Sequence, residues 1–405
     1  MFAEYCTAAR VSRTRIQWSG QYFSLPENTA SAARQRRHCK GRSMAAARAV
    51  TDMSHTFDMG SFRRRVFTPV SIAFVVLAMF FSTTPDLPAW VVIAPFAVSV
   101  LVLGLPHGAL DHLVPARLAG RRPTVASIAT VAIVYLVLAV VVLLMWRVAP
   151  ATAFVGFIAL TWFHWGQGDL WIDLAEAHRG RLQPRLLRAG TVLVRGGLPM
   201  LVPLLFHPDT YERVRLGTIA LFGQQSFSST FMGLDATGRG VVGIVYALVV
   251  LATALATWRT SRTHVERGAW AHDQMETVVL ALFFALGPPV LTVGLYFCLW
   301  HSLRHIVRLE LLDPRGAHFL RHGQLVKVAG RFAMDAAPIT TIAVLFLGAI
   351  YCAIPPQGGD PETVLAPYLV LISALTVPHV AVVSYMDFRQ GVWSRASGPG
   401  SAMAL

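Results

Sequence analysis

Two histidines spaced four residues apart interrupt an apolar stretch in the last third of the chain. His301 and His305 lie in FCLWHSLRH, residues 297–305. On a helix this spacing stacks both imidazoles on one face, within reach of a single ion. The run before them, from about residue 289, is apolar enough to lie in a membrane, where an ionisable group is costly and marks a functional site by default. The pair indicates a metal site, with two interfacial histidines hydrogen-bonded to neighbouring helices as the alternative.

Two other stretches place polar residues at the ends of apolar runs. GLPHGALDH, residues 104–112, contains His107, Asp111 and His112. TWFHWGQGD, residues 161–169, contains His164 between aromatic residues. Each alone is as compatible with a polar helix end or a packed core histidine as with a ligand. A further histidine, His379 in TVPHV, is either a fifth site residue, a proton partner or a core residue.

The composition is that of an integral membrane protein. Of 405 residues, 55% are hydrophobic and 14% charged, and the mean hydropathy is +0.54, whereas soluble domains carry about a quarter charged residues. The net charge of +14 comes from short arginine clusters between apolar runs, a pattern of cytoplasmic loops that gives no reason to expect nucleic acid as a partner. The four cysteines show no paired spacing, so neither disulfides nor a zinc ribbon are expected.

The apolar runs predict an all-α, polytopic transmembrane bundle with about ten spans, eight to ten being compatible with the sequence. Gly287-Pro288-Pro289 separates two of them, because consecutive prolines break a helix. With both termini in the cytoplasm, this arrangement places the arginine clusters, including Arg304 and Arg308, on the cytoplasmic side of the membrane. The predicted localisation is the cytoplasmic (inner) membrane. The runs cover roughly 66–84, 89–107, 124–146, 151–172, 190–206, 240–258, 275–287, 289–311, 336–355 and 364–386.

Two tails flank the predicted bundle, which covers 63–390. Residues 1–62 are rich in Arg, Ser and Ala and predict a basic, disordered segment. Met44, Met53 and Met59 are alternative translation starts. A start at any of them would leave the residues before it untranslated. Residues 391–405 are expected to form a flexible C-terminal tail.

The topology brings the histidines together. His107, His164 and the His301/His305 pair all lie towards the cytoplasmic ends of their spans, at similar depth, so a shared metal site is expected. Imidazole suits iron, copper or zinc. Structural zinc would usually bring cysteine, and hydrolytic zinc would want a base such as Asp111. Four imidazoles on a six-coordinate Fe(II) would leave two positions open for dioxygen and substrate. The apolar surroundings favour a lipophilic substrate dissolved in the bilayer.

The motifs PHGALDH, FHWGQGD and WHSLRH, in that order with RGGLPMLVPLLFHP between them, resemble the Brp/Blh family of β-carotene 15,15′-dioxygenases over about residues 98–388. These are bacterial and archaeal membrane proteins found alongside rhodopsins. The resemblance implies that Fe(II) and dioxygen cleave the central double bond of β-carotene to two molecules of retinal, with a rhodopsin as the expected acceptor of the product. The basic tail departs from the family pattern, which puts the start codon in question.

The resemblance also implies roles for individual residues, with no catalytic side chain beyond the metal ligands. The ligands would be His107, His164, His301 and His305. Candidate walls for the polyene are Trp162, Phe163 and Trp300, with membrane-core packing as the alternative for each. Their positions near these ligands make Asp111, His112 and His379 candidates for groups around the metal.

Three alternatives belong to other classes. A membrane di-iron desaturase or hydroxylase would need HxxxH and HxxHH boxes, of which the chain has only the first. A transporter or metal permease would need carboxylates deep within spans, and Asp169 and Glu276 are expected near span ends. A non-enzymatic rhodopsin accessory protein would need no iron. Metal content and carotene turnover separate these alternatives.

Overall fold

Helices account for the regular secondary structure of the described chain. The structure, a computed structural model, describes residues 57–84, 87–176, 182, 184–223, 235–353 and 359–394. These residues form helices and connecting turns without a strand, which confirms the all-α prediction. Most of the predicted basic tail lies outside the described residues. The part of it that is described forms α2 (Met59–Phe62), in which Met59 and Phe62 are buried.

The long helices follow the predicted apolar runs. Each predicted run coincides with one helix or with a series of shorter segments. The long helices are α3 (Thr68–Thr83), α4 (Ala89–Val98), α7 (Val125–Val148), α8 (Pro150–Ala175), α9 (Arg185–Phe206), α11 (Ala236–Thr260), α12 (His264–Leu286), α16 (Leu325–Ala353) and α17 (Pro361–Arg389). The shorter segments are η2 (Arg63–Phe67), η3 (Ser99–Leu103), α5 (Gly104–Ala109), η4 (Asp111–Leu113), α6 (Val114–Leu118), α10 (Pro208–Ala220), α13 (Pro289–Tyr296), η7 (Phe297–Ser302), α14 (Leu303–Leu311) and α15 (Pro314–Arg321).

Most of these helices can cross a membrane. In the described part of the chain, 8 helical segments are long and apolar enough to do so, which makes this a multi-pass membrane protein. The other two predicted spans correspond to α8 and α12. Both have membrane length, but α8 carries Asp169 and α12 carries Glu276, and both carboxylates are buried among other side chains.

The predicted break between the seventh and eighth runs is confirmed. α12 ends at Leu286, Gly287 is extended, and Pro288 caps the start of α13. Proline cannot donate to the hydrogen-bond ladder of a preceding helix, so the chain turns back here.

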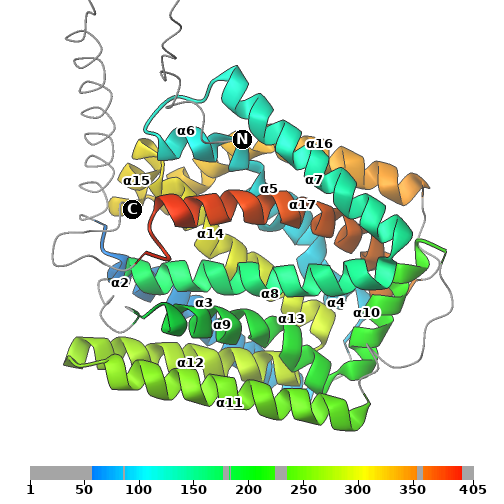
Figure 1. Ribbon diagram of the computed structural model, residues 1–405, viewed down its shortest axis with the longest axis horizontal. Helices are drawn as coiled ribbons and strands as arrows, with labels where there is room; N and C mark the ends of the chain where they lie inside the picture. The colour runs from blue at the N-terminus through cyan, green and yellow to red at the C-terminus, as the bar shows by residue number, and fades with distance from the viewer. Residues whose placement is uncertain are drawn as a thin grey trace, which may run out of the picture. The chain divides into compact units, whose positions relative to one another are not determined.

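Helices α8 and α9 pack with their backbones in close approach, and α17 runs beside α8 (Figure 1). A Cβ atom at Gly166 would lie 2.1 Å from the carbonyl oxygen of Val192, and one at Gly196 would lie 1.8 Å from that of Trp162. Only glycine permits this contact, since small residues let helix backbones meet closely in membranes. The contact fixes the position of α8, which carries His164.

Several arginines expected on the cytoplasmic face lie inside the bundle instead. Arg304 and Arg308 are 3% and 1% exposed. Arg304 bonds Asp169 at 2.9 Å and Glu276 at 3.1 Å, so these two carboxylates, expected near span ends, are paired inside the bundle. Buried charges are tolerated where they are paired. The sequence could not show this pairing, because the partners lie on helices far apart in the chain.

The C-terminal boundary of the bundle also differs from the prediction. Val392, placed in the flexible tail, is fully buried, and its carbonyl accepts a hydrogen bond from Arg188. The packed part of the chain therefore extends past residue 390.

Candidate metal centre

Five buried histidines from separate helical segments form one cluster. The four predicted ligands lie on α5, α8, η7 and α14, and His379 joins them from α17. The His164 ring centroid lies 4.7 Å from that of His301 and 4.7 Å from that of His379. The His379 centroid lies 5.0 Å from those of His107 and His305. All five side chains are buried. The structure thus brings the four predicted histidines together and places His379 among them.

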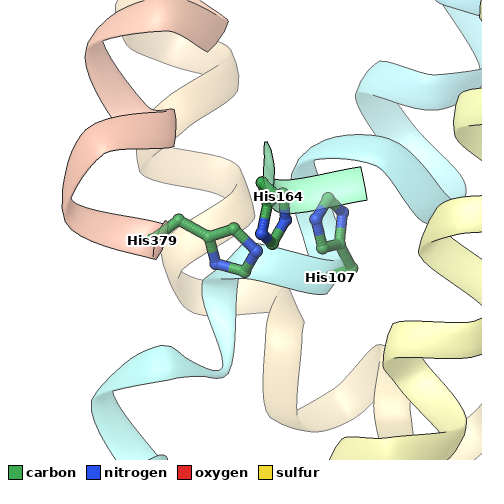
Figure 2. A group of neighbouring side chains, drawn as sticks. All are labelled: His107, His164 and His379. Atoms are coloured by element: carbon green, nitrogen blue, oxygen red, sulfur yellow. The ribbon is translucent and has the colours of Figure 1, made fainter. Parts of the chain in front are cut away.

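Two groups of three residues in the described chain have potential ligand atoms close enough to share a metal ion, and His379 belongs to both. Potential ligand atoms of His107, His164 and His379 lie within 4.8 Å of one another, and the three rings converge from different helices (Figure 2). The same limit holds for Asp111, His305 and His379. The sequence left His379 open between a site residue, a proton partner and a core residue, and its position among the other histidines favours a residue of the site.

The free nitrogens of the cluster fit a metal ion. Within the described chain, the buried Nε2 atoms of His164, His301, His305 and His379 have no hydrogen-bond partner. Buried polar atoms are rarely left unpaired. Four orphaned imidazole nitrogens gathered in one place supply the neutral nitrogen donors that iron, copper or zinc accepts.

Asp111 and Tyr135 hold the His379 ring. The Nδ1 atom of His379 lies 2.7 Å from Oδ2 of Asp111, and the Tyr135 hydroxyl donates to the same oxygen. A carboxylate that accepts from one ring nitrogen fixes the tautomer and leaves the other nitrogen free to bind a metal. Asp111 therefore acts through His379. His112, by contrast, is half-buried and pairs with the carbonyl of Ala109 at 2.8 Å, so the structure does not bring it into the cluster.

A second chain of hydrogen bonds orients His164. Its Nδ1 atom lies 3.4 Å from Oε1 of Gln167, whose amide nitrogen donates to Asp387 at 2.7 Å. Asp387 in turn pairs with Arg308 at 2.7 Å. The residues of FHWGQGD thus provide both a histidine and the group that positions it.

His301 lies in the π-helical segment η7, and η3, also π-helical, directly precedes the helix that carries His107. Such bulges are frequent at functional sites because they re-aim side chains. The His301 and His305 rings are nearly parallel with centroids 6.4 Å apart, and each lies nearer to a histidine of another helix. The simple i, i+4 spacing predicted the shared face but not this bulge.

An apolar cavity of about 220 Å³ adjoins the histidines. Four of them, all but His305, form part of its wall. Most of the remaining wall is aliphatic and aromatic, including Phe154, Phe157, Ile158, Met200 and Leu369. The cavity is therefore suited to an apolar ligand that reaches the histidine cluster.

The three aromatic residues expected along the substrate do not line this cavity. Phe163 is exposed on the outside of α8, and Trp162 donates its indole N–H to a carbonyl of α9 at 2.8 Å. The guanidinium of Arg304 lies over the ring of Trp300, with its Cζ atom 3.6 Å from the ring centroid. Trp165 lies on the wall instead and stacks on Phe297. Sequence alone did not indicate which face of these uniformly apolar helices turns inward.

The fold and the site together define a multi-pass membrane protein with a buried histidine cluster suited to a metal ion beside an apolar cavity. Residues 98–387 match the family model described as beta-carotene 15,15'-dioxygenase, and the chain belongs to this family of enzymes. The match confirms the resemblance seen in the motifs.

Named relatives agree with the family. The chain is 42% identical to "Probable beta-carotene 15,15'-dioxygenase Blh" of Halobacterium salinarum over 74% of this chain and 85% of that protein. It is 28% identical to "Probable beta-carotene 15,15'-dioxygenase Brp" of the same species, over 74% and 84%. It is 23% identical to "Beta-carotene 15,15'-dioxygenase" of the uncultured marine bacterium 66A03, over 71% and 91%. No solved structure matches the chain.

Proposed function

We propose that this protein uses Fe(II) and dioxygen to cleave the central double bond of β-carotene, giving two molecules of retinal. The named activity of its relatives supports the reaction. The observation that carries the proposal is the group of unpartnered, buried Nε2 atoms beside an apolar cavity. β-Carotene is a hydrocarbon, and it offers such a cavity only apolar contacts.

The proposed iron ligands are His107, His164, His301 and His305, as the motifs predict. We add His379, because Asp111 leaves its Nε2 atom free and its ring lies near three of the others. Iron bound there would activate dioxygen for insertion across the double bond. An all-imidazole donor set suits iron and leaves the ion its full positive charge.

The remaining residues position and shield the reaction. The apolar wall would hold the polyene and exclude water, which restricts side reactions and fixes the bond that is presented. Asp111 and Gln167 hold the imidazoles of His379 and His164 in one orientation. The proposed reaction needs no side-chain nucleophile and no acid–base pair.

The membrane setting supplies the proposed route of substrate and product. The carotene would enter from the bilayer of the cytoplasmic membrane, with both termini of the protein on the cytoplasmic side. The retinal formed would pass to a rhodopsin. The support for this orientation is the exposed arginines between the spans, such as Arg121, Arg122 and Arg259; the buried Arg304 and Arg308 do not contribute to it.

Pigment analysis in a carotene-accumulating bacterium tests the proposed reaction. We expect β-carotene to fall and retinal to appear when the chain is expressed with iron supplied, and neither to occur with His301→Ala. Unchanged β-carotene, with the protein verified in the membrane, would contradict the proposal. A shorter or longer apocarotenal would contradict central cleavage.

A further inference from the structure

Two threonines of the cavity wall lack the hydrogen bond that a helical threonine usually makes. A helical threonine usually donates its hydroxyl to a carbonyl one turn earlier, as Thr191 does to Leu187 and Thr376 to Ile372. Thr161 and Thr340 are 5% and 8% exposed. Neither hydroxyl has a hydrogen-bond partner among the described residues.

Both threonines line the apolar cavity. Three other hydroxyls on the same wall are already paired: Tyr135 with Asp111, Tyr368 with Ser99, and Thr376 with Ile372. Because buried hydroxyls are rarely left unpaired, the two threonines indicate a polar atom on an otherwise apolar ligand.

The helices place these hydroxyls at the histidine end of the cavity. Thr161 precedes His164 by three residues on α8, so it lies on nearly the same helix face, about 4.5 Å away along the axis. Thr340 lies on α16, which packs against α5, the helix that carries His107. The ligand atom they serve should therefore lie close to the reacting carbon.

We propose that Thr161 and Thr340 form a subsite for the aldehyde oxygen of retinal. This inference rests on the proposed function, in which cleavage beside the histidines creates an aldehyde at that end of the cavity. β-Carotene has no oxygen and leaves both hydroxyls unpaired. A carbonyl oxygen has two lone pairs and accepts from both threonines. The cavity thus binds the product by hydrogen bonds that the substrate cannot make, and these bonds slow release of the aldehyde.

Ligand binding to the purified full-length protein tests the subsite. The probes are all-trans-retinal and axerophthene, the hydrocarbon with the same polyene but no oxygen, and the readout is quenching of tryptophan fluorescence. Thr161→Val and Thr340→Val keep the shape of the side chain and remove the hydroxyl. Thr191→Val is the matched control, since Thr191 is similarly buried at 8% exposure, its hydroxyl is already paired with the carbonyl of Leu187, and it lies outside the cavity wall.

We expect each of Thr161→Val and Thr340→Val to weaken retinal binding about tenfold, about 1.4 kcal/mol, and to leave axerophthene binding unchanged. Thr191→Val should alter neither affinity. Unchanged axerophthene binding shows that a variant is folded with an intact cavity.

Three results would overturn the subsite. These are a wild-type protein that does not bind retinal, unchanged retinal affinity in both variants, and an equal loss for retinal and axerophthene. Turnover of β-carotene by the wild type is measured separately. Turnover without a threonine effect overturns the subsite alone, whereas a threonine effect without turnover supports the subsite and overturns the proposed reaction.

Discussion

At the scale of single residues, side chains beside Nδ1 of His379 and His164 decide which ring nitrogen of these two histidines is free. Asp111 holds Nδ1 of His379, and Gln167 lies beside Nδ1 of His164. In both cases Nε2 remains unpaired and buried. Groups that orient metal ligands in this way commonly contribute 10- to 100-fold to metal affinity or activity, by rough estimate.

Replacing any of His107, His164, His301 or His305 by alanine should abolish retinal formation and lower the iron content. Asp111→Asn should reduce activity only about 10- to 100-fold, because the amide still contacts the His379 ring. Both quantities are measured on the purified protein, by metal analysis and chromatography. His112→Ala is the control and should keep its iron. Full activity in His301→Ala would refute the ligand assignment.

His379→Ala tests whether the fifth histidine is a ligand. With cobalt(II) in place of iron, loss of a ligand should change the visible absorption, which responds to coordination number. We also expect weaker iron retention during dialysis against a chelator. An unchanged cobalt spectrum with normal iron retention would show that His379 is not bound to the metal.

At the scale of elements, the close contact of α8 with α9 sets the position of His164. Two glycines allow the contact, and the carbonyls opposite them leave no space for a side chain. The π-helical turn in η7 similarly sets the direction of His301. Local helix propensity gives no sign of either feature, because each depends on what the helix packs against.

Gly196→Ala should destabilise the protein, since its Cβ would lie 1.8 Å from the Trp162 carbonyl oxygen and the helices would have to separate. Overpacking of this kind costs about 1–3 kcal/mol or more. Thermal unfolding in detergent measures the change. Gly156→Ala on α8 is the control, because its Cβ would meet nothing within 4 Å. Equal unfolding temperatures for the two variants would contradict the close contact.

At the scale of the whole molecule, a buried ion-pair network links helices that are distant in sequence. Glu276 of α12 pairs with Arg63 at 3.0 Å, Arg195 at 2.9 Å and Arg304 at 3.1 Å. Removing one partner of a buried pair leaves unpaired charge and costs about 3–5 kcal/mol. The network joins the segment that precedes α3 to the helix series that bears His301 and His305.

Glu276→Gln should therefore lower the unfolding temperature more than Glu212→Gln, which changes a carboxylate paired with Arg215 within α10 alone. Unfolding followed by circular dichroism in detergent compares the two variants. A smaller loss for Glu276→Gln would contradict the role of the network.

Cysteine labelling tests the proposed orientation of the bundle. Cys352 is exposed near the end of α16 that the ten-span arrangement places outside, whereas Cys298 is buried. Cys6 and Cys39 lie in the N-terminal segment and are first changed to serine. A membrane-impermeant maleimide added to spheroplasts should label this variant, and should not label it once Cys352→Ser is added. Labelling that requires permeabilisation would reverse the orientation.

The sequence predicted those parts of the molecule that depend on local pattern. Helices, the break at Gly287-Pro288-Pro289 and the grouping of four histidines follow from hydropathy, proline chemistry and spacing. The burial of Arg304 and the outward direction of Phe163 do not, because they depend on which side of a uniformly apolar helix meets its neighbours. The role of His379 was also ambiguous, because its hydrogen-bond partner Asp111 is far away in the chain and the sequence does not show their contact.

The yield of retinal per molecule of β-carotene consumed tests the proposed reaction most directly. The purified, iron-loaded protein would be incubated with β-carotene in air, and both pigments measured by chromatography. Central cleavage predicts two molecules of retinal for each β-carotene lost, and no loss when iron is removed. Apocarotenals of unequal length, or consumption of β-carotene without retinal, would contradict it.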